Sequence, residues 1–414
     1  MGRPEIMRHR DFNLYWSGVV LSEVGTRGTF AAILYHVYDL SGSTLQTGLV
    51  GLAQAIALLL LSPLGGAIAD RMDRRRLLQV TQVVSLLISG WLATVTMLGI
   101  VEVWQILLAV LLNTSAATFE RPARDALIPA LVPRTELVHA FALLNPSREV
   151  AILIGPAIAG GLIALGGPQL MYLVDVASYA VLVVVLLVLR TPAPPERDRS
   201  ERLHRSIEEG ARFLWGRPII VQFMALDLAA TVFGAYRVLL PAIATDLLMV
   251  GAVGYGVLGS APSAGALVGS AVIYRIVHRR GSGKIILGSL AGYGLMNIFL
   301  VWAGVLPGTA ALIAAFGAAM GIGFFDALAT TIRHAAVQLE TPDAIRGRVT
   351  ALYLMTSRSG PALGDLNIGW LAGMLGPVGA LTLGGMIPVL TAGITAVRSP
   401  SLRGYQVVLR REHD

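Results

Sequence analysis

The sequence predicts an all-α integral membrane protein with twelve transmembrane helices arranged as two six-helix bundles. Three observations predict this fold: apolar residues fall in long blocks, basic residues fall in alternate loops, and the second half repeats motifs of the first. Of the 414 residues, 55% are hydrophobic and only 14% are charged, whereas an average soluble domain has roughly 25% charged residues. Because so apolar a chain could not cover a soluble surface with polar groups, lipid is the expected solvent.

Twelve apolar blocks are long enough to cross a bilayer, which takes about 20 residues of α-helix. They predict spans at residues 12–37, 46–69, 77–98, 104–124, 137–164, 170–189, 218–244, 253–277, 285–304, 309–333, 349–374 and 378–397. We expect a first bundle at 1–190, a cytoplasmic linker with an amphipathic helix at 191–217, a second bundle at 218–400 and a cytoplasmic tail at 401–414. The linker helix could lie on the inner leaflet, but a tether between the halves is the simpler interpretation.

Basic residues mark one side of the membrane. The segment before the first span and the loops after the even-numbered spans contain arginine clusters, whereas the loops after the odd-numbered spans contain neither arginine nor lysine. Because such clusters stay on the cytoplasmic side, we expect a multi-pass protein of the bacterial inner (cytoplasmic) membrane with both termini in the cytoplasm. The same loops account for the net charge of +7, so nucleic-acid binding is not expected.

Several kinds of chemistry are excluded by composition and motifs. The chain has no cysteine, so disulfides, thiolate metal sites and cysteine nucleophiles are excluded. It has no HExxH or GxSxG motif, and its seven histidines are not clustered. We therefore expect no membrane enzyme, no metal site and no cofactor.

The two halves repeat one another in the order of their motifs. The matched residues are Arg124 with Arg333, Pro133 with Pro342, Gly155 with Gly360 and Pro156 with Pro361. Parallel repeats of this kind are typical of transporters whose two halves rock about a shared pathway. The Gly-Pro pairs predict sites where the fifth and eleventh spans bend and approach a partner helix closely, although generic membrane-helix packing would also explain them.

The end of the second span reads GGAIADRMDRRR. It resembles the loop signature of the major facilitator superfamily, and the matching residues are Gly66, Asp70, Arg71, Arg74 and Arg75. Asp73 departs from this signature, because the family usually has glycine there. The resemblance implies transport by alternating access and a cytoplasmic gate at these residues, to which we also assign Arg124. Plain membrane anchoring would explain the arginines but not the acid.

Other segments are similar to the drug:proton antiporter and enterobactin exporter-like branch of that superfamily: RDF at 10–12, YDLSGS at 38–43 and ARDALIP at 123–129. This resemblance implies export of a bulky, hydrophobic or amphipathic, drug-like molecule by proton antiport. We expect a monomer whose partners are the lipid bilayer, protons and a small-molecule substrate. The alternatives are a dedicated exporter of a siderophore or lipid-like metabolite, and a non-transporting membrane scaffold. The fourth span lacks the mid-membrane arginine usual in these antiporters and has Asn113 instead.

Charged residues inside the spans are the candidate site. Each costs at least about 2.5–3.5 kcal/mol at the bilayer centre, so each should face a cavity or a partner. Glu23 and Arg27 lie one helical turn apart and can pair, and Glu23 and Asp227 are the predicted proton-binding groups. The other predicted cavity charges are Arg148, Glu149, Arg237, Arg358 and Asp365. The arginines of this set would suit an anionic substrate. Asp175, in the outer part of the sixth span, is interpreted as structural.

Overall fold

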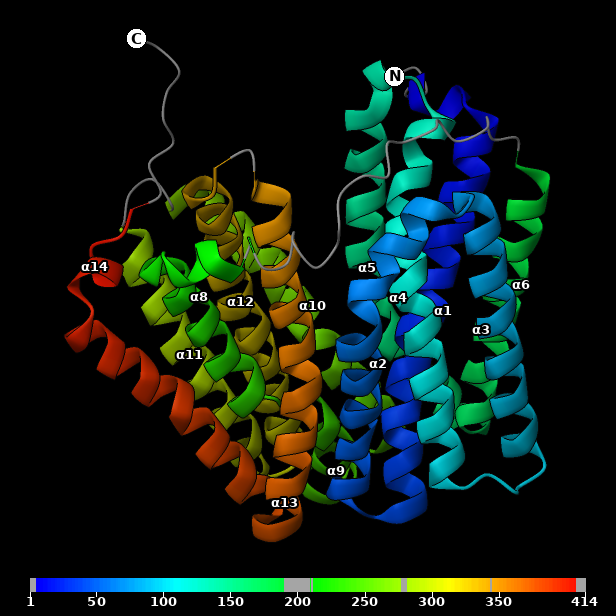
Figure 1. Ribbon diagram of the computed structural model, residues 1–414. Helices are drawn as coiled ribbons and strands as arrows, with labels where there is room; N and C mark the ends of the chain where they lie inside the picture. The colour runs from blue at the N-terminus through cyan, green and yellow to red at the C-terminus, as the bar shows by residue number, and fades with distance from the viewer. Residues whose placement is uncertain (1–4, 190–208, 210, 277–280, 343–344, 407–414) are drawn as a thin grey trace. The chain divides into compact units, whose positions relative to one another are not determined.

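The computed structural model describes residues 5–189, 209, 211–276, 281–342 and 345–406, and within these ranges it contains helices and no strand (Figure 1). The side chains of residues 5, 63–71 and 351 are also outside the description. The chain divides into two compact units, one formed by Met1–Arg199 with Val250–Ser260 and the other by Ser200–Met249 with Ala261–Asp414. Most of the predicted linker, including Leu203 and Ile207, lies outside the described residues.

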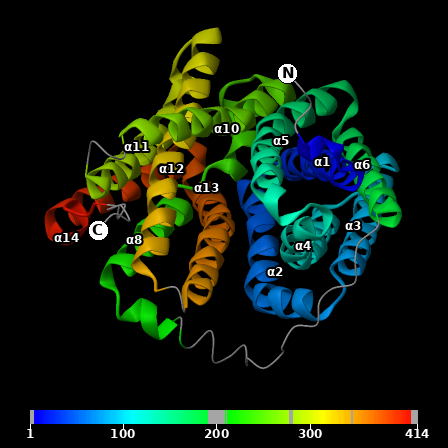
Figure 2. The ribbon, with the colours of Figure 1, turned by 90° about the horizontal axis from the view of Figure 1, so that it is seen from above.

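The first unit contains six long helices. They are α1 (Arg10–Ser41), α2 (Thr44–Arg71), α3 (Arg74–Met97), α4 (Val103–Leu131), α5 (Leu137–Gly166) and α6 (Pro168–Val188), with short 3-10 turns η1 (Glu5–Arg8) and η2 (Arg134–Glu136). Helix α1 packs against α5 and α6, α3 packs against α4 and α6, and α2 lies along α4 (Figure 2). Helix α4 runs past its predicted end at residue 124, because the ARDALIP segment continues the helix.

The second unit begins with α8 (Pro218–Leu228), the π-turn η3 (Ala229–Phe233), η4 (Arg237–Leu239), α9 (Leu240–Ala242) and the π-turn η5 (Ile243–Leu247). It continues with α11 (Ser282–Trp302), η6 (Ala303–Val305), α12 (Thr309–Glu340), α13 (Arg346–Arg398) and α14 (Pro400–Arg403). Helix α10 (Gly251–Ile276) contributes residues to both units. Helix α11 packs extensively against α12 and α13.

The predicted span 218–244 is not one continuous helix, contrary to expectation. The helix is interrupted at Gly234–Tyr236 between the two π-turns. The carbonyl groups freed by the break find side-chain donors: Asn367 Nδ2 donates to the Val232 carbonyl at 3.1 Å, and the Tyr293 hydroxyl donates to the Gly234 carbonyl at 2.9 Å. Because unpaired carbonyl groups are costly in lipid, these two donors are what makes the break tolerable.

Helix α13 is interrupted at Gly376, whose backbone is non-helical with φ of 73° and ψ of 165°. Glycine adopts positive φ without a side-chain clash, and Pro377 is suited to the first turn of the helix that follows. The interruption lies between the predicted spans 349–374 and 378–397.

Glycines with positive φ recur where consecutive helices are joined. They are Gly42, Gly99, Gly167, Gly251, Gly308 and Gly376, one in each loop that the charge pattern predicts to be outside the cell. At Gly42, the amide that caps α1 donates to the Tyr38 carbonyl at 2.7 Å. A side chain at these positions would strain the backbone, so these short turns depend on glycine.

Ten helices among the described residues are long and apolar enough to cross a membrane. Helix α1, which contains Glu23 and Arg27, is not among the ten, and α13 counts once although it has 53 residues. The chain is therefore a multi-pass membrane protein by length and composition, and the number twelve stays a prediction.

Candidate functional site

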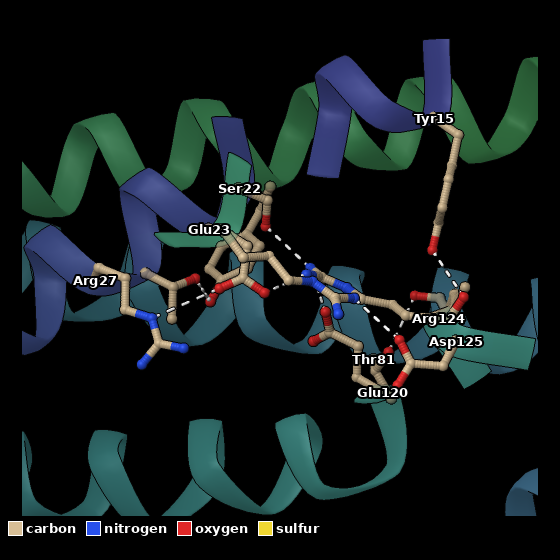
Figure 3. A network of polar contacts seen from close by, with 12 residues as sticks. Tyr15, Ser22, Glu23, Arg27, Thr81, Glu120, Arg124 and Asp125 are labelled. Carbon is tan, nitrogen blue, oxygen red and sulfur yellow. Dashed lines mark hydrogen bonds and ion pairs between the residues drawn. The ribbon is translucent and has the colours of Figure 1, made fainter. Parts of the chain in front are cut away.

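A buried arginine lies at the centre of a charged network in the first unit (Figure 3). Arg124 of α4 forms ion pairs with Glu23 of α1, at 3.1 Å, and with Glu120 one turn earlier on α4. The Arg124 side chain is 7% exposed, and its other terminal nitrogen also donates to the Ser22 hydroxyl at 3.3 Å. Arg27 is the looser partner of Glu23, at 3.6 Å, and is 43% exposed.

Arg124 has two acidic partners. A buried guanidinium without a counter-ion would be strongly unfavourable, so Arg124 needs at least one ionised carboxylate. Because Glu23 and Glu120 both contact Arg124, one of them can take up a proton while the other keeps the arginine neutralised. The arrangement is therefore chemically suited to binding and releasing a proton inside the membrane.

The second unit contains the matching ion pair. Arg333 of α12 contacts Asp227 of α8 at 2.6 Å, with both side chains almost fully buried, and also donates to Thr330 at 3.0 Å. In each half, a carboxylate of the first helix therefore pairs with the repeated arginine of the fourth helix. Ala329 occupies the position that corresponds to Glu120, and the neighbouring acid of this pair is instead Asp326 of α12, which accepts a hydrogen bond from the Thr330 hydroxyl at 3.2 Å.

A further ion pair lies at the interrupted helix. Arg237, the first residue of η4, contacts Asp365 of α13 at 2.6 Å. The Asp365 side chain is 1% exposed, whereas that of Arg237 is 39% exposed. The pair ties the broken segment to α13 next to the two carbonyl groups held by Asn367 and Tyr293.

Three predicted cavity charges lie outside the contacts described so far. Arg148 of α5 contacts Asp125 of α4 at 3.0 Å, in a pair that is partly exposed. Glu149 of α5 and Arg358 of α13 are exposed on their helices.

The described gate residues bind the ends of neighbouring helices. Arg74 donates to the Ala126 carbonyl at 2.8 Å, and Arg75 donates to the carbonyls of Leu186 and Leu187 at 2.7 and 2.8 Å. Cationic groups are favourable at the carbonyl end of a helix, where α6 stops. Arg124 lies in the Glu23 network instead of with these arginines.

The other gate residues are only partly described. The side chains of Gly66, Asp70 and Arg71 lie outside the described residues. Asp73, the departure from the family signature, accepts a hydrogen bond from the Arg76 amide at 2.9 Å and so begins α3 as its N-cap. An aspartate is among the preferred residues for that position.

Each Gly-Pro motif allows close contact with the first helix of its half. A β-carbon on Gly155 would lie 2.7 Å from Arg27 Cβ, and one on Gly360 would lie 2.5 Å from Thr231 Oγ1. The helices continue through Pro156 and Pro361 without a break in their assignment. The glycines thus position α1 and η3 against the fifth and eleventh spans, and the bend stays a prediction.

Sequence reasoning missed two partners in these networks. Glu120 lies one turn before Arg124, a spacing that favours pairing, and this signal was available. Arg333 was identified only as the repeat of Arg124. The repeat indicated that Arg333, like Arg124, would have an acidic partner.

Buried ion pairs inside a bundle of membrane-spanning helices are typical of a membrane transporter. The model of a major-facilitator family described as transmembrane secretion effector matches residues 5–406, and the chain belongs to this family. It is 28% identical over 364 residues to the enterobactin exporter EntS of Shigella boydii serotype 18, covering 86% of this chain and 83% of that protein. It is 27% identical over 385 residues to EntS of Citrobacter koseri, covering 91% and 88%.

Solved structures share the fold at low sequence identity. The nucleoside transporter NupG has a TM-score of 0.71 at 15% identity, covering 94% of this chain and 97% of its own. A D-xylose-proton symporter has a TM-score of 0.70 at 14% identity, covering 95% and 99%. A bacterial homologue of the iron transporter ferroportin has a TM-score of 0.68 at 19% identity, covering 92% and 98%. These similarities concern the fold alone.

Proposed function

We propose that this chain is a secondary transporter that exports a siderophore across the bacterial inner membrane by alternating access, in exchange for protons. The observation that carries the proposal is the repeated ion pair, Glu23 with Arg124 and Asp227 with Arg333. The names of the EntS relatives support a siderophore as cargo. They do not support the drug-like cargo and multidrug resistance that the sequence alone suggested first.

The proposal includes a complete six-plus-six arrangement. Counting α1 as a span, and dividing α13 at Gly376, gives twelve spans with the segment α8–η5 as the seventh. The bundles are then 1–190 and 218–400, joined by the linker 191–217, and the tail 401–414 follows. The arginine clusters support cytoplasmic termini, and we propose that the protein acts as a monomer.

Proton uptake is coupled to the change of access through the ion pairs of Arg124 and Arg333. When Glu23 takes up a proton, its ion pair with Arg124 is lost, while Arg124 still pairs with Glu120. The electrostatic attraction between α1 and α4 therefore weakens. When Asp227 takes up a proton, Arg333 loses its ion pair with α8 and keeps its contacts within α12, with Thr330 and, electrostatically, with Asp326. Proton uptake thus loosens the first helix of each half from the fourth, which is how we propose that protonation promotes the change of access.

The cytoplasmic gate is the other half of the mechanism. We propose that Gly66, Asp70 and Arg71, together with Arg74 and Arg75, hold the inner side closed in one state. Arg74 and Arg75 already bind carbonyl groups at the ends of α4 and α6, so release of the gate would change how these helices end.

The test measures transport of enterobactin, as the probe, into inside-out proteoliposomes with and without a pH gradient. Glu23→Gln and Asp227→Asn should each lose most of the gradient-driven uptake while the protein still inserts and purifies. Asp39→Asn is the matched control, because Asp39 is an exposed acid near the end of the same helix α1. Gradient-driven uptake that is unchanged in both variants would refute proton coupling through these groups, and absence of enterobactin transport by the wild type would refute the cargo.

A further inference from the structure

A third buried acid lies in the first unit, outside the Arg124 network. Asp175 of α6 is 1% exposed and accepts a hydrogen bond from the Ser89 hydroxyl of α3, with Oγ 2.8 Å from Oδ2. Its other carboxyl oxygen, Oδ1, has no hydrogen-bond partner among the described residues. The Thr29 hydroxyl of α1 lies against the same carboxyl and is likewise without a hydrogen-bond partner in the part of the chain that the structure describes. Two unpaired buried oxygens on neighbouring helices therefore face one carboxyl group.

No positive charge from the described residues compensates this carboxyl. Within the described ranges, no arginine, lysine or histidine forms an ion pair with Asp175, and the groups that α1 and α3 present to it, Thr29 and Ser89, are uncharged. The titratable groups that interact with it electrostatically are Glu120 of α4 and the Tyr179 phenol on α6 itself. Neither group supplies a cation, and an ionised Glu120 would repel a second carboxylate.

A neutral carboxylic acid removes the need for a cation beside Asp175. Burying an unpaired carboxylate costs several kcal/mol in real proteins, whereas a protonated acid carries one donor in place of the charge. With the proton on Oδ1, that donor can bind Thr29 Oγ1 while Oδ2 still accepts from Ser89. One proton therefore gives both carboxyl oxygens a hydrogen-bond partner without a buried charge.

Helix α1 closes this site against water. A β-carbon on Gly25 would lie 2.5 Å from Ser178 Oγ and 3.0 Å from Asp175 Oδ1. The Ser178 hydroxyl itself donates to the Asp175 backbone carbonyl at 2.8 Å, so it does not compensate the carboxyl. Because Gly25 lets α1 lie directly on α6, even a small separation of the two helices would expose Oδ1.

We propose that Asp175 is a second proton-binding site, protonated while α1 lies against α6 and separate from the Glu23–Arg124–Glu120 network. When α1 moves away from α6, water reaches Oδ1, the O–H bond breaks and the proton passes to water. The remaining carboxylate then accepts hydrogen bonds from Ser89 and Thr29. Because α1 also carries Glu23, movement of this one helix would act on both sites.

The test uses infrared spectroscopy of the full-length protein in liposomes at about pH 6, where an aspartate of ordinary pKa, about 3.9, is ionised. We expect the wild type to have a carboxylic-acid C=O band that is lost in Asp175→Asn and kept in Asp39→Asn. After transfer to D₂O, this band should shift slowly in the wild type and several-fold faster in Gly25→Ala. A wild-type spectrum that matches that of Asp175→Asn would overturn the proposal.

A second measurement separates a proton from a metal cation. Asparagine can reproduce the hydrogen bonds of the neutral acid, so Asp175→Asn should keep the melting temperature of the wild type, and neither protein should respond to exchange of choline chloride for NaCl. A sodium-dependent rise in melting temperature that Asp175→Asn abolishes would overturn the proposal in favour of a sodium site. Neither readout requires transport, so the proposed function and this site can fail independently.

Discussion

The Asp227–Arg333 pair allows a quantitative test of how buried charges hold the second unit together. Arg333 Nη2 lies 2.6 Å from Asp227 Oδ1, and the side chains of Asp227 and Arg333 are 5% and 2% exposed. Removing one partner of such a pair leaves an uncompensated buried charge and costs about 3–5 kcal/mol. We therefore expect Asp227→Ala to destabilise the protein by about that amount, and Asp227→Ala combined with Arg333→Met to recover much of the loss, because the double variant buries no unpaired charge.

The matched control is the pair formed by Arg148 and Asp125, whose side chains are 21% and 49% exposed. Partly exposed pairs contribute about 0–1 kcal/mol, so Asp125→Ala should have little effect. Reversible unfolding of the detergent-solubilised protein by denaturant, followed by helix content, measures the wild type and the three variants. Equal losses for Asp227→Ala and Asp125→Ala, or a double variant no more stable than Asp227→Ala, would refute the reasoning.

Three other substitutions test individual contacts. Glu120→Gln should keep the network assembled but change the pH dependence of gradient-driven uptake, since one of the two acidic partners of Arg124 is lost; a pH profile that overlays the wild type would argue against a shared proton. Gly155→Val should destabilise by about 1–3 kcal/mol, because it overpacks the contact with Arg27, and an unchanged melting curve would contradict that contact. Asn367→Ala should cost about 1–3 kcal/mol by leaving the Val232 carbonyl unpaired, and denaturant unfolding with no loss would mean that another donor replaces it.

Much of the membrane architecture could be predicted because lipid imposes simple rules on sequence. Long apolar blocks and arginine-free alternate loops indicated where the helices lie, and Gly376 separates two predicted spans within α13. The interruption at Gly234 was not predicted, because hydropathy does not report whether a helical carbonyl has a donor elsewhere. That information lies in Asn367 and Tyr293, which are distant in sequence from the break.

The candidate site was predicted only where its contacts are local. The pairing of Glu23 with Arg27 follows from helical spacing, and the structure contains it at 3.6 Å. The tighter partner of Glu23 is Arg124, from a helix far along the chain, at 3.1 Å. A single sequence does not indicate which distant helices touch. The pairing of Glu23 with Arg124 could therefore be identified only from the structure.

The glycine turns have a consequence for how the protein can move. Each lies in a short turn between consecutive helices, so the two helix ends that such a turn joins cannot move far apart. Under the proposed alternating access, opening at these turns would separate neighbouring helix pairs, while the two helices that share a turn would move together. Inserting flexible residues after Gly42 or Gly376 would loosen that restraint without touching a single buried charge.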